Sequence, residues 1–420
     1  MTFKQLIIFL FLYSTAAYSQ KLASLESRAK IELEHENYSN AIKLYTQLLI
    51  NDPNNILYLE DRAFCFHELK QFSNAIIDCN NAMKLTPNYR NKYYILKIRS
   101  SSYFYLEKWQ SAFEDLDNYS DMYSDNIDIN LARAYTIYKL ERYNEAIESY
   151  NSILSDQTIT KEQTVEAYGT LGFCYLRLDS ISKAYDYYKK IVTLDSLSND
   201  GLYLLAALLT IEYKFDEMVE CYTKILANDS NDVTALFNRG IQYAFIENYD
   251  LAIRDLKMYI LKTNYSSKGM YELALAYSGK KEYDKAINAY MNCLKYDPNS
   301  SRIYNQISWT FFLSNKFMEG LKYANKAIAL DKENEDAYDT RGCIFYKLKN
   351  YNSAIQDFNS ALSLDSLYSN AYYYRALCYI KKNEKVNACI DLSKVIQDKY
   401  YNIKEGEKPT EILIRENCNN

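Results

Sequence analysis

The stretch from Val233 to Ser266 reads VTALFNRGIQYAFIENYDLAIRDLKMYILKTNYS and contains the pattern on which the fold depends. Two small residues, Gly240 and Ala252, stand 12 positions apart, and the aromatic Tyr249 precedes the second by three. Small residues at such positions let two helices approach closely. The apolar residues on either side follow the spacing of amphipathic helices. The stretch therefore predicts one tightly packed helical hairpin.

The same pattern recurs along the chain with a period of 34 residues. The residue equivalent to Ala252 is small in almost every copy, and the series runs Ala41, Ala75, Ala112, Ala146, Ala184, Met218, Ala252, Ala286, Gly320, Ala354 and Ala388. Two intervals are longer, at 37 and 38 residues, which predicts longer inter-repeat loops around residues 88–91 and 156–163. A fixed period of this length is the signature of a repeat architecture.

This pattern resembles the tetratricopeptide repeat, a helical hairpin with small residues at its positions 8 and 20 and proline at position 32. Asn238, Arg239 and Gly240, followed by Tyr249 to Ile253, carry the likeness most clearly, and Pro53, Pro87 and Pro298 occupy the proline position. The resemblance implies an all-α fold, a right-handed α-solenoid or superhelix. It covers residues 20–402 as about eleven repeats, which start near residues 22, 56, 93, 127, 165, 199, 233, 267, 301, 335 and 369.

Composition agrees with a helical chain. Only 9 Gly and 4 Pro among 420 residues argue against a sandwich, a barrel or a glycine-rich nucleotide-binding fold. A net charge of -5 provides no basic field for nucleic acid, which is therefore not an expected partner. The 45 Tyr are expected to be mostly core residues, because they recur at fixed repeat positions.

Both ends of the chain are expected to lie outside the repeats. Lys4, the apolar run 6–13 and small residues before Ser19 predict a signal peptide over residues 1–19. We therefore expect export to the periplasm, outer surface or medium, with a Gram-negative bacterial envelope favoured, and no transmembrane segment after cleavage. Residues 403–420 form a capping segment, in which Pro409 begins a short helix over the last hairpin.

Two repeat positions co-vary in a way that predicts ion pairs. Positions 7 and 23 are nearly equidistant from the turn of each hairpin, and in five repeats they are Arg and Asp. We interpret these residues as structural rather than as a ligand-binding ladder. The predicted pairs are Arg62 with Asp78, Arg99 with Asp115, Arg239 with Asp255, Arg341 with Asp357, and Arg375 with Asp391.

The nine cysteines matter because an oxidising compartment would allow disulfides to form. Cys378 and Cys389 occupy positions 10 and 21 of the last repeat, which face each other across a hairpin, so a disulfide between them is expected. The sequence contains no CxxC and only two His, which argues against a structural zinc site. No cofactor or metal is expected.

A binding surface follows from the resemblance, since in this family the first helix of each repeat lines a concave groove. Residues at positions 2, 5, 9 and 12 then form an aromatic groove with sparse polar groups, which suits an extended peptide. Packing between neighbouring helices is the alternative role for these rings. The candidates are Tyr94, Lys97, Tyr135, Tyr138, Phe173, Tyr203, Phe237, Tyr271, Asn305, Trp309, Phe312 and Asp339.

The expected function is a non-enzymatic scaffold or adaptor that holds a protein segment. No catalytic triad, GxGxxG or GxxxxGK motif occurs, and the repeats occupy nearly the whole chain. The lysines and asparagines with which related repeats clamp acidic chaperone tails are absent: the first three repeats have Glu26, Asp61 and Ile98 among those positions. A glycan-binding solenoid, for which Asn305, Asp336 and Asp339 would supply polar groups, and a purely structural spacer remain alternatives.

Overall fold

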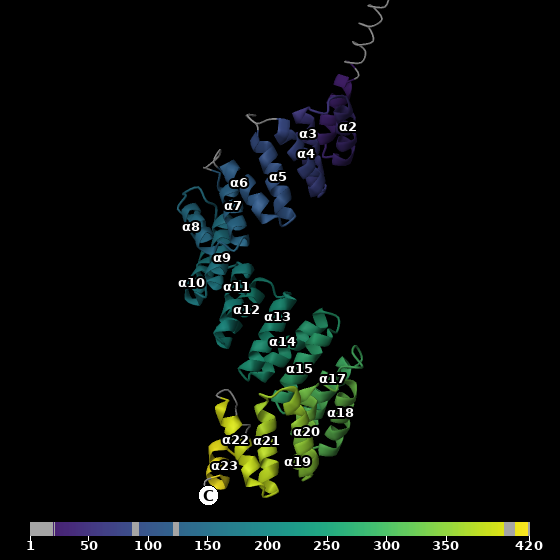
Figure 1. Cartoon of the computed structure of the whole chain (residues 1–420), viewed down its shortest axis with the longest axis vertical. Helices are drawn as coiled ribbons and strands as arrows, with labels where there is room; N and C mark the ends of the chain where they lie inside the picture. Colours follow the sequence, from purple (N-terminus) through teal and green to yellow (C-terminus); the bar gives the residue numbers. More distant parts are fainter. Residues whose placement is uncertain (1–19, 21, 86–91, 121–125, 399–407, 419–420) are drawn as a thin grey trace, which may run out of the picture. The chain divides into compact units, whose positions relative to one another are not determined.

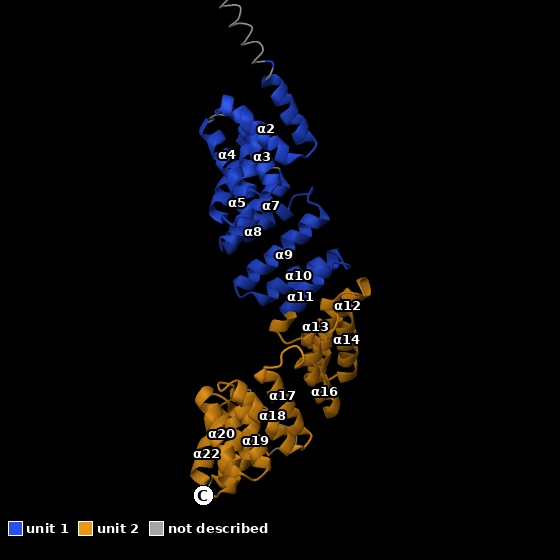
Figure 2. Cartoon of the chain, turned by 90° about the vertical axis from the view of Figure 1, so that its right-hand side faces the viewer, with its two compact units in different colours: residues 1–208 blue, residues 209–420 orange. Residues whose placement is uncertain are grey.

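The computed structural model describes residues 20, 22–85, 92–120, 126–398 and 408–418. The expected signal peptide, the loop around 88–91 and the linker 403–407 lie largely or wholly outside these residues. All regular elements of the described chain are helices (Figure 1), and none of them is long and apolar enough to cross a membrane. Two compact units are distinguished, one ending at residue 208 and one starting at residue 209 (Figure 2).

The first unit consists of paired helices, of which we call the first in each repeat the A helix and the second the B helix. Residues 22–34 are helical and precede α2 as the first A helix. The helices that follow are α2 (Tyr38–Asn51), α3 (Ile56–Glu68), α4 (Phe72–Leu85), α5 (Lys92–Tyr105), α6 (Trp109–Ser120), α7 (Ile127–Lys139), α8 (Tyr143–Leu154), α9 (Lys161–Arg177) and α10 (Ile181–Leu194).

The second unit continues the alternation, and α11 (Asn199–Ile211) contains the boundary between the units. Its helices are α12 (Phe215–Asn228), α13 (Val233–Phe245), α14 (Tyr249–Lys262), α15 (Ser267–Gly279), α16 (Tyr283–Cys293), α17 (Ser301–Leu313), α18 (Phe317–Leu330), α19 (Glu335–Lys347), α20 (Tyr351–Leu364), α21 (Ser369–Lys381), α22 (Lys385–Gln397) and α23 (Thr410–Asn417). Within it each A helix packs against its own B helix, and α17, α19 and α21 also pack side by side.

Side-chain caps fix where the A helices begin. Asn55, Asn126, Asp232 and Asn334 each accept a hydrogen bond from the backbone N–H three residues later, at 3.2, 3.1, 2.9 and 2.9 Å. Such a cap satisfies one of the donors that a helix start leaves without an intrahelical partner. The helices that they cap start at residues 56, 127, 233 and 335, which are the first residues of the corresponding repeats.

The turn inside each hairpin adopts a left-handed backbone without using glycine. Glu141, Lys281 and Lys349 have φ values of 61°, 62° and 62°, and they stand at the same position of their repeats. Other residues at this position with positive φ are Glu36, Lys70, Glu107, Asp179, Tyr213, Glu247, Asn315 and Asn383. This conformation costs an L-residue about 1–2 kcal/mol. The turns are therefore imposed by packing of the two helices that they connect.

Close approach of the A and B helices explains the small residue at position 8. A Cβ added to Gly172 would lie 2.1 Å from Cε1 of Tyr188, and one added to Gly342 would lie 2.7 Å from Cε1 of Phe358. Tyr188 and Phe358 are 1% and 0% exposed. These two repeats thus bury a large ring of the B helix against a part of the A helix that carries no side chain.

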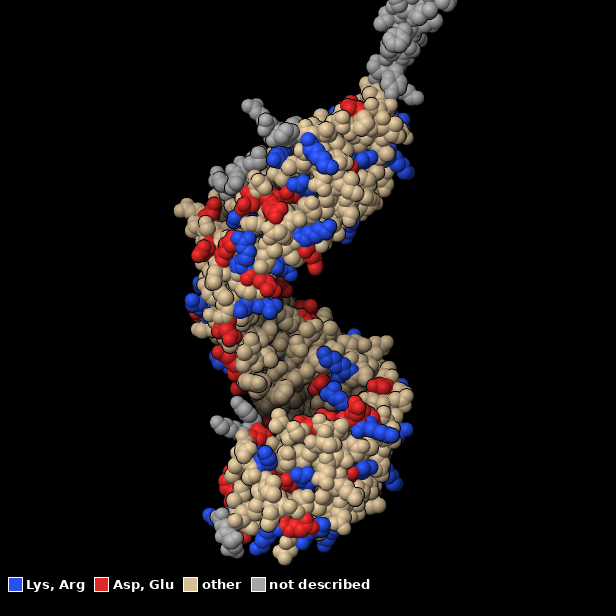
Figure 3. Space-filling model, in the orientation of Figure 1, with Lys and Arg blue, Asp and Glu red and all other residues tan. Residues whose placement is uncertain are grey.

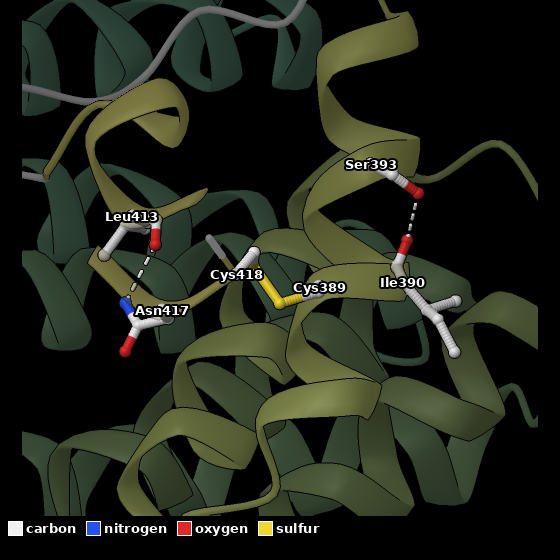
Figure 4. Close-up of a disulfide and its surroundings, with 6 residues drawn as sticks. All are labelled: Cys389, Ile390, Ser393, Leu413, Asn417 and Cys418. Atoms are coloured by element: carbon white, nitrogen blue, oxygen red, sulfur yellow. Dashed lines mark hydrogen bonds between the residues drawn. A yellow bond between two sulfur atoms is a disulfide. The ribbon is translucent and has the colours of Figure 1, made fainter. Parts of the chain in front are cut away.

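The C-terminal helix α23 packs against α22 and is tied to it by a disulfide between Cys389 and Cys418 (Figure 4). The Cα atoms of these two residues are 5.7 Å apart. The predicted Cys378–Cys389 disulfide is therefore wrong. Cys378 is a free thiol, fully buried in the core of the last repeat, whereas Cys389 is half-buried where α23 packs.

Candidate binding site on the A helices

The five predicted Arg–Asp pairs link the A and B helices of their hairpins. Their shortest N···O distances are 2.7 Å for Arg62–Asp78, 2.6 Å for Arg99–Asp115, 2.6 Å for Arg239–Asp255, 2.7 Å for Arg341–Asp357 and 2.7 Å for Arg375–Asp391. Burial raises the pKa of Asp115 and Asp357, although the paired arginines act in the opposite direction. The pairs therefore offset a desolvation cost and fix the register of each hairpin.

Each of these arginines also reaches the B helix of the preceding repeat, a contact that sequence reasoning missed. The third donor, Nη1, donates to a side-chain oxygen there, at 2.6 to 3.2 Å. The acceptors are Thr46, Asn80, Thr223, Asn325 and Asn359. Four of them lie 16 residues before their arginine. Because this spacing recurs from repeat to repeat, the repeat pattern could have predicted the contact. These arginines have a structural role between three helices.

Arg133 shows the same geometry with a different partner. Its own repeat provides Ser149 at position 23, and the guanidinium instead binds Asp117 on the preceding B helix, with Nη2 2.6 Å from Oδ1. Arg133 and Asp117 are 28% and 44% exposed. The charge of this arginine is therefore compensated by the preceding repeat rather than its own.

Position 5 of the A helix is more buried than a groove position should be. Phe237, Asn305 and Asp339 are 5%, 5% and 4% exposed, because neighbouring A helices pack over this position. Phe237 packs against Tyr259 with a ring-centroid distance of 4.8 Å. Phe312, at position 12, is 7% exposed and stacks on Trp309 at 4.8 Å. The prediction that Phe237 and Phe312 line an open groove is wrong, since both rings belong to the core.

A pocket of about 370 Å³ lies on the A helices of the last three repeats. It brings together three predicted residues, Asn305 and Trp309 of α17 and Asp339 of α19. The pocket is lined by Asn305, Gln306, Trp309, Asp336, Asp339, Thr340, Tyr368 and Asn370. The predicted set omitted Gln306 and Thr340, which occupy position 6, and Tyr368, which ends the preceding repeat. In the related repeats that clamp chaperone tails, position 6 contacts the ligand. That resemblance could have identified Gln306 and Thr340 as candidates.

Hydrogen bonds hold the polar groups of this pocket in place. The Tyr368 hydroxyl donates to Oδ1 of Asp336, and Nδ2 of Asn370 donates to Oδ2 of Asp339 at 2.6 Å. Burial raises the pKa of Tyr368, and the negative charges of Asp339 and Asp336 raise it further. In contrast, Oδ1 of buried Asn305 has no hydrogen-bond partner within the described residues. An unsatisfied buried acceptor is costly, which makes it a place where a ligand donor would be stabilised.

Two pockets in the first unit are lined by other predicted residues. Lys97 lines a pocket of about 370 Å³ with Phe104, and Tyr135 lines one of about 250 Å³ that Phe104 also borders. Phe104 contacts Trp109 edge-on at 5.2 Å, and Tyr135 continues this aromatic cluster to Tyr138 at 5.8 Å. These rings pack mainly on one another, as the packing alternative expects.

The other predicted groove residues lie outside the pocket of the last three repeats. Tyr94 is half-buried near Phe64, and burial raises the pKa of Tyr94 to about 12. Phe173 is 40% exposed and contacts Tyr188 edge-on. Tyr203 is half-buried on α11, and Tyr271 accepts a hydrogen bond from Nε of Arg302 at 3.0 Å. None of these four lines the pocket of the last three repeats.

The surface carries charges of both signs. On the face drawn in Figure 3, Lys and Arg side chains are interspersed with Asp and Glu over both units. The chain carries 49 basic and 54 acidic residues. This face therefore resembles the solvated surface of a helical protein rather than a nucleic-acid-binding surface.

Comparison with known proteins identifies the repeats directly. Residues 165–196, 267–300 and 335–366 match the tetratricopeptide repeat model. These segments correspond to the hairpins α9–α10, α15–α16 and α19–α20. The chain therefore contains tetratricopeptide repeats, arranged as helical hairpins in both units.

Similar proteins share these repeats over part of their length. A TPR repeat-containing protein of Methanocaldococcus jannaschii, MJ1428, is 27% identical over 51% of this chain and 40% of its own length. Hsp70-Hsp90 organizing protein 1 of Glycine max is 22% identical over 68% of this chain and 43% of its own length. Yeast Tom70 aligns over 91% of this chain and 93% of its own, with 15% identity and a TM-score of 0.43. The chain spans less than half the length of the curated relatives that it matches.

Proposed function

We propose that this protein is a non-enzymatic scaffold that holds an extended segment of a partner protein against its A helices. The pocket formed by α17, α19 and α21 carries the proposal, because three consecutive repeats contribute polar groups to one place there. The unsatisfied Oδ1 of Asn305 and the indole of Trp309 combine a buried acceptor with a large apolar surface. This combination is typical of protein-binding hot spots.

The presence of tetratricopeptide repeats supports this proposal. Hsp70-Hsp90 organizing protein 1 is named for the proteins that it organises, and this chain is similar to it over 286 residues. The clamp residues for acidic chaperone tails are absent from the first three repeats, so we propose a different partner.

We further propose that the protein acts outside the cytoplasm, as part of a bacterial cell-envelope assembly. The leader pattern of residues 1–19 supports export. The disulfide between Cys389 and Cys418 also supports it, since structural disulfides persist mainly in oxidising compartments.

Glycan binding is the second candidate, and the amides and carboxylates beside Trp309 favour it. Crosslinking in intact cells followed by affinity capture separates the two. We compare the wild type with an Asn305→Ala and Trp309→Ala double variant. A protein captured by the wild type and lost with the variant supports the scaffold. Equal capture by both, or no protein with either, contradicts the proposed site.

A further inference from the structure

The outer side of α14 carries four exposed residues, Arg254, Met258, Leu261 and Tyr265, which we call the α14 stripe. They follow one another at spacings of four, three and four residues, and they are 58%, 46%, 67% and 54% exposed. Residues at these spacings share one side of a helix. We propose that the α14 stripe docks an amphipathic helix of a partner protein that presents an acidic residue beside its apolar residues. This surface lies on the B helices and goes beyond the proposed function.

The apolar residues of the α14 stripe distinguish it from the neighbouring B helices. At the positions that Met258 and Leu261 take in their repeat, α12 and α16 have small or polar residues, which are Lys224, Ala227, Asn292 and Lys295. The solvent-facing side of a surface helix is ordinarily polar. An exposed apolar patch with polar surroundings marks an interaction site. Met258 and Leu261 therefore indicate a contact with another molecule.

Arg254 adds a positive charge where other repeats have a negative one. The four preceding repeats have an acid at this position, in the order Glu114, Glu148, Asp186 and Glu220. Nε of Arg254 donates to Oδ1 of Asp255 at 3.1 Å, and Nε of Arg239 binds Oδ2 of the same carboxylate at 2.6 Å. Two guanidinium groups thus share one buried carboxylate. Because a guanidinium has five N–H donors, Arg254 can also bind a carboxylate of the partner.

A pocket of about 490 Å³ lies beside the α14 stripe, between α12 and α14. The charged residues that line it are Arg239, Arg254, Lys262 and Asp255, which gives three positive charges and one negative charge. Nζ of Lys262 donates to Oδ1 of Asn231, which is a neutral acceptor. Leu226, Leu236 and Met258 add apolar surface to the same pocket. The pocket therefore suits an acidic side chain, whose short aliphatic stem ends in a carboxylate.

A second pocket, of about 310 Å³, lies between α14 and α16. Ile260, Met270 and Leu273 line it and are 7%, 8% and 9% exposed, whereas the rings of Tyr265 and Tyr296 beside them are 54% and 59% exposed. Small-molecule and side-chain pockets of this kind are lined mainly by apolar groups. An apolar side chain of the partner helix fits here, on the opposite side of α14 from the charged pocket.

The C-terminal end of α14 holds Tyr265 beside this second pocket. The N–H of Tyr265 donates to the carbonyl of Ile260 at 2.9 Å, a bond that is characteristic of the Schellman motif. Asn264 and Tyr265 have φ values of 52° and 69°, and no other described non-glycine residue has a positive φ outside the turn of a hairpin. This backbone costs about 1–2 kcal/mol per residue. The position of the ring is therefore fixed before a partner binds.

A lipid surface is the other class of partner that basic and apolar side chains suit. The α14 stripe is flanked by pockets of about 490 and 310 Å³, and a flat bilayer surface leaves such pockets unfilled. The side chains of a helix form ridges that pack into the grooves of another helix. The two pockets therefore favour a protein helix over a membrane.

The test uses a phage library of single helices randomised on one face, panned on the full wild-type chain. Synthetic peptides of the selected helices are then titrated against Arg254→Gln and Leu261→Gln variants. The matched controls are Lys322→Gln on α18 and Ile50→Gln on α2, which change exposed residues at the same two repeat positions.

We expect the selected helices to carry Asp or Glu beside their apolar residues. Leu261→Gln should weaken binding about tenfold, because burial of a leucine contributes most of the apolar contact. Arg254→Gln should weaken binding at least threefold, and both controls should bind like the wild type.

A second measurement uses the wild-type chain alone and does not depend on how a variant folds. The acidic residue of the selected peptide is replaced by its amide, which should weaken binding to the wild type at least threefold. The same replacement should have no effect on binding to Arg254→Gln, because the partner of the carboxylate is already absent there.

The outcomes separate this inference from the proposed function. The Asn305→Ala and Trp309→Ala double variant should bind the selected helices like the wild type, whether or not the A helices hold a segment. Helices that bind Leu261→Gln and Arg254→Gln as tightly as the wild type, or that carry Lys or Arg beside their apolar residues, would overturn the inference. Failure to select any helix would also overturn it. In that case, sedimentation of the wild type but not of Leu261→Gln with vesicles of phosphatidylcholine and phosphatidylglycerol would assign the α14 stripe to a membrane.

Discussion

Arg375 donates two hydrogen bonds to the carboxylate of Asp391, from Nε to Oδ2 at 2.8 Å and from Nη2 to Oδ1 at 2.7 Å. Its Nη1 donates to Oδ1 of Asn359 on the preceding B helix at 2.6 Å. One side chain thus joins three helices of two repeats. Because the same arrangement recurs at five positions, it provides a register for the stacking of repeats as well as for each hairpin.

Removing only the arginine should be more harmful than removing the pair. Arg375→Leu leaves Asp391, which is 3% exposed, as a buried charge without its guanidinium, and we expect a loss of about 3–5 kcal/mol in the free energy of unfolding. The Arg375→Leu and Asp391→Leu double variant should lose less. Chemical denaturation measures both. Arg142→Leu, which breaks an exposed pair with Glu145, is the control and should cost less than about 1 kcal/mol. A double variant as unstable as the single one would refute the pairing account.

The contact between Gly172 and Tyr188 should tolerate no side chain. Gly172→Ala places a Cβ 2.1 Å from a ring that is 1% exposed, so we expect destabilisation by about 1–3 kcal/mol. Gly169→Ala is the matched control on the same helix, since its nearest neighbour would be 3.9 Å away. This control should be neutral or stabilising by about 0.5–1 kcal/mol. Thermal melting of both variants tests the prediction, and equal melting temperatures would contradict it.

Glu60 should make stability depend on pH. Burial raises its pKa to about 7, and the neighbouring charge of Asp61 adds to this. Because this value lies above the ordinary 4.5, folding takes up a proton between the two, and stability falls as the pH rises from 4.5 to 7. We expect Glu60→Gln to unfold like the wild type at pH 4.5 and to be more stable at pH 8, by on the order of 2 kcal/mol.

Denaturation of Glu60→Gln at the two pH values makes this measurement. Glu68→Gln changes an exposed carboxylate on the same helix, and it should alter stability little at either pH. A Glu60→Gln variant that gains nothing at pH 8 would show that Glu60 is solvated rather than buried.

The Cys389–Cys418 disulfide should be required for α23 to stay ordered. This helix has only eight residues, and isolated helices of that length are marginal in water. Peptide mapping without reduction should recover residues 389 and 418 in one linked fragment and Cys378 as a free thiol. Hydrogen exchange over α23 should accelerate in Cys389→Ser. In Cys378→Ser, exchange should stay unchanged in helices that do not contact residue 378, such as α13. Recovery of Cys389 linked to Cys378 would overturn this assignment.

The sequence predicted the repeats well because their constraints are local and periodic. Gly172 is small because Tyr188 packs on it, and the same geometry returns every 34 residues, so each copy repeats the evidence. The Arg–Asp contacts were foreseen for the same reason. The contact from Arg375 to Asn359 links two repeats, and the co-variation within one hairpin does not predict it.

The candidate site was predicted less well. Asn305, Trp309 and Asp339 were identified from their repeat positions, whereas the burial of Phe237 and Phe312 depends on how closely neighbouring A helices pack. That spacing is a tertiary property, and no single repeat determines it. The Cys389–Cys418 disulfide was missed for a similar reason, since the place where α23 docks is fixed by packing after the periodic pattern has ended.

The most direct test of the central claim is site-specific photo-crosslinking in the cells of origin. A photoreactive phenylalanine analogue replaces Gln306, which lines the pocket, or Asp284, which is 83% exposed on a B helix. We predict a discrete protein adduct from position 306 that disappears when Trp309→Ala is added, and none from position 284. No adduct at position 306, or the same adduct from both positions, would contradict the proposal that this face holds a partner protein.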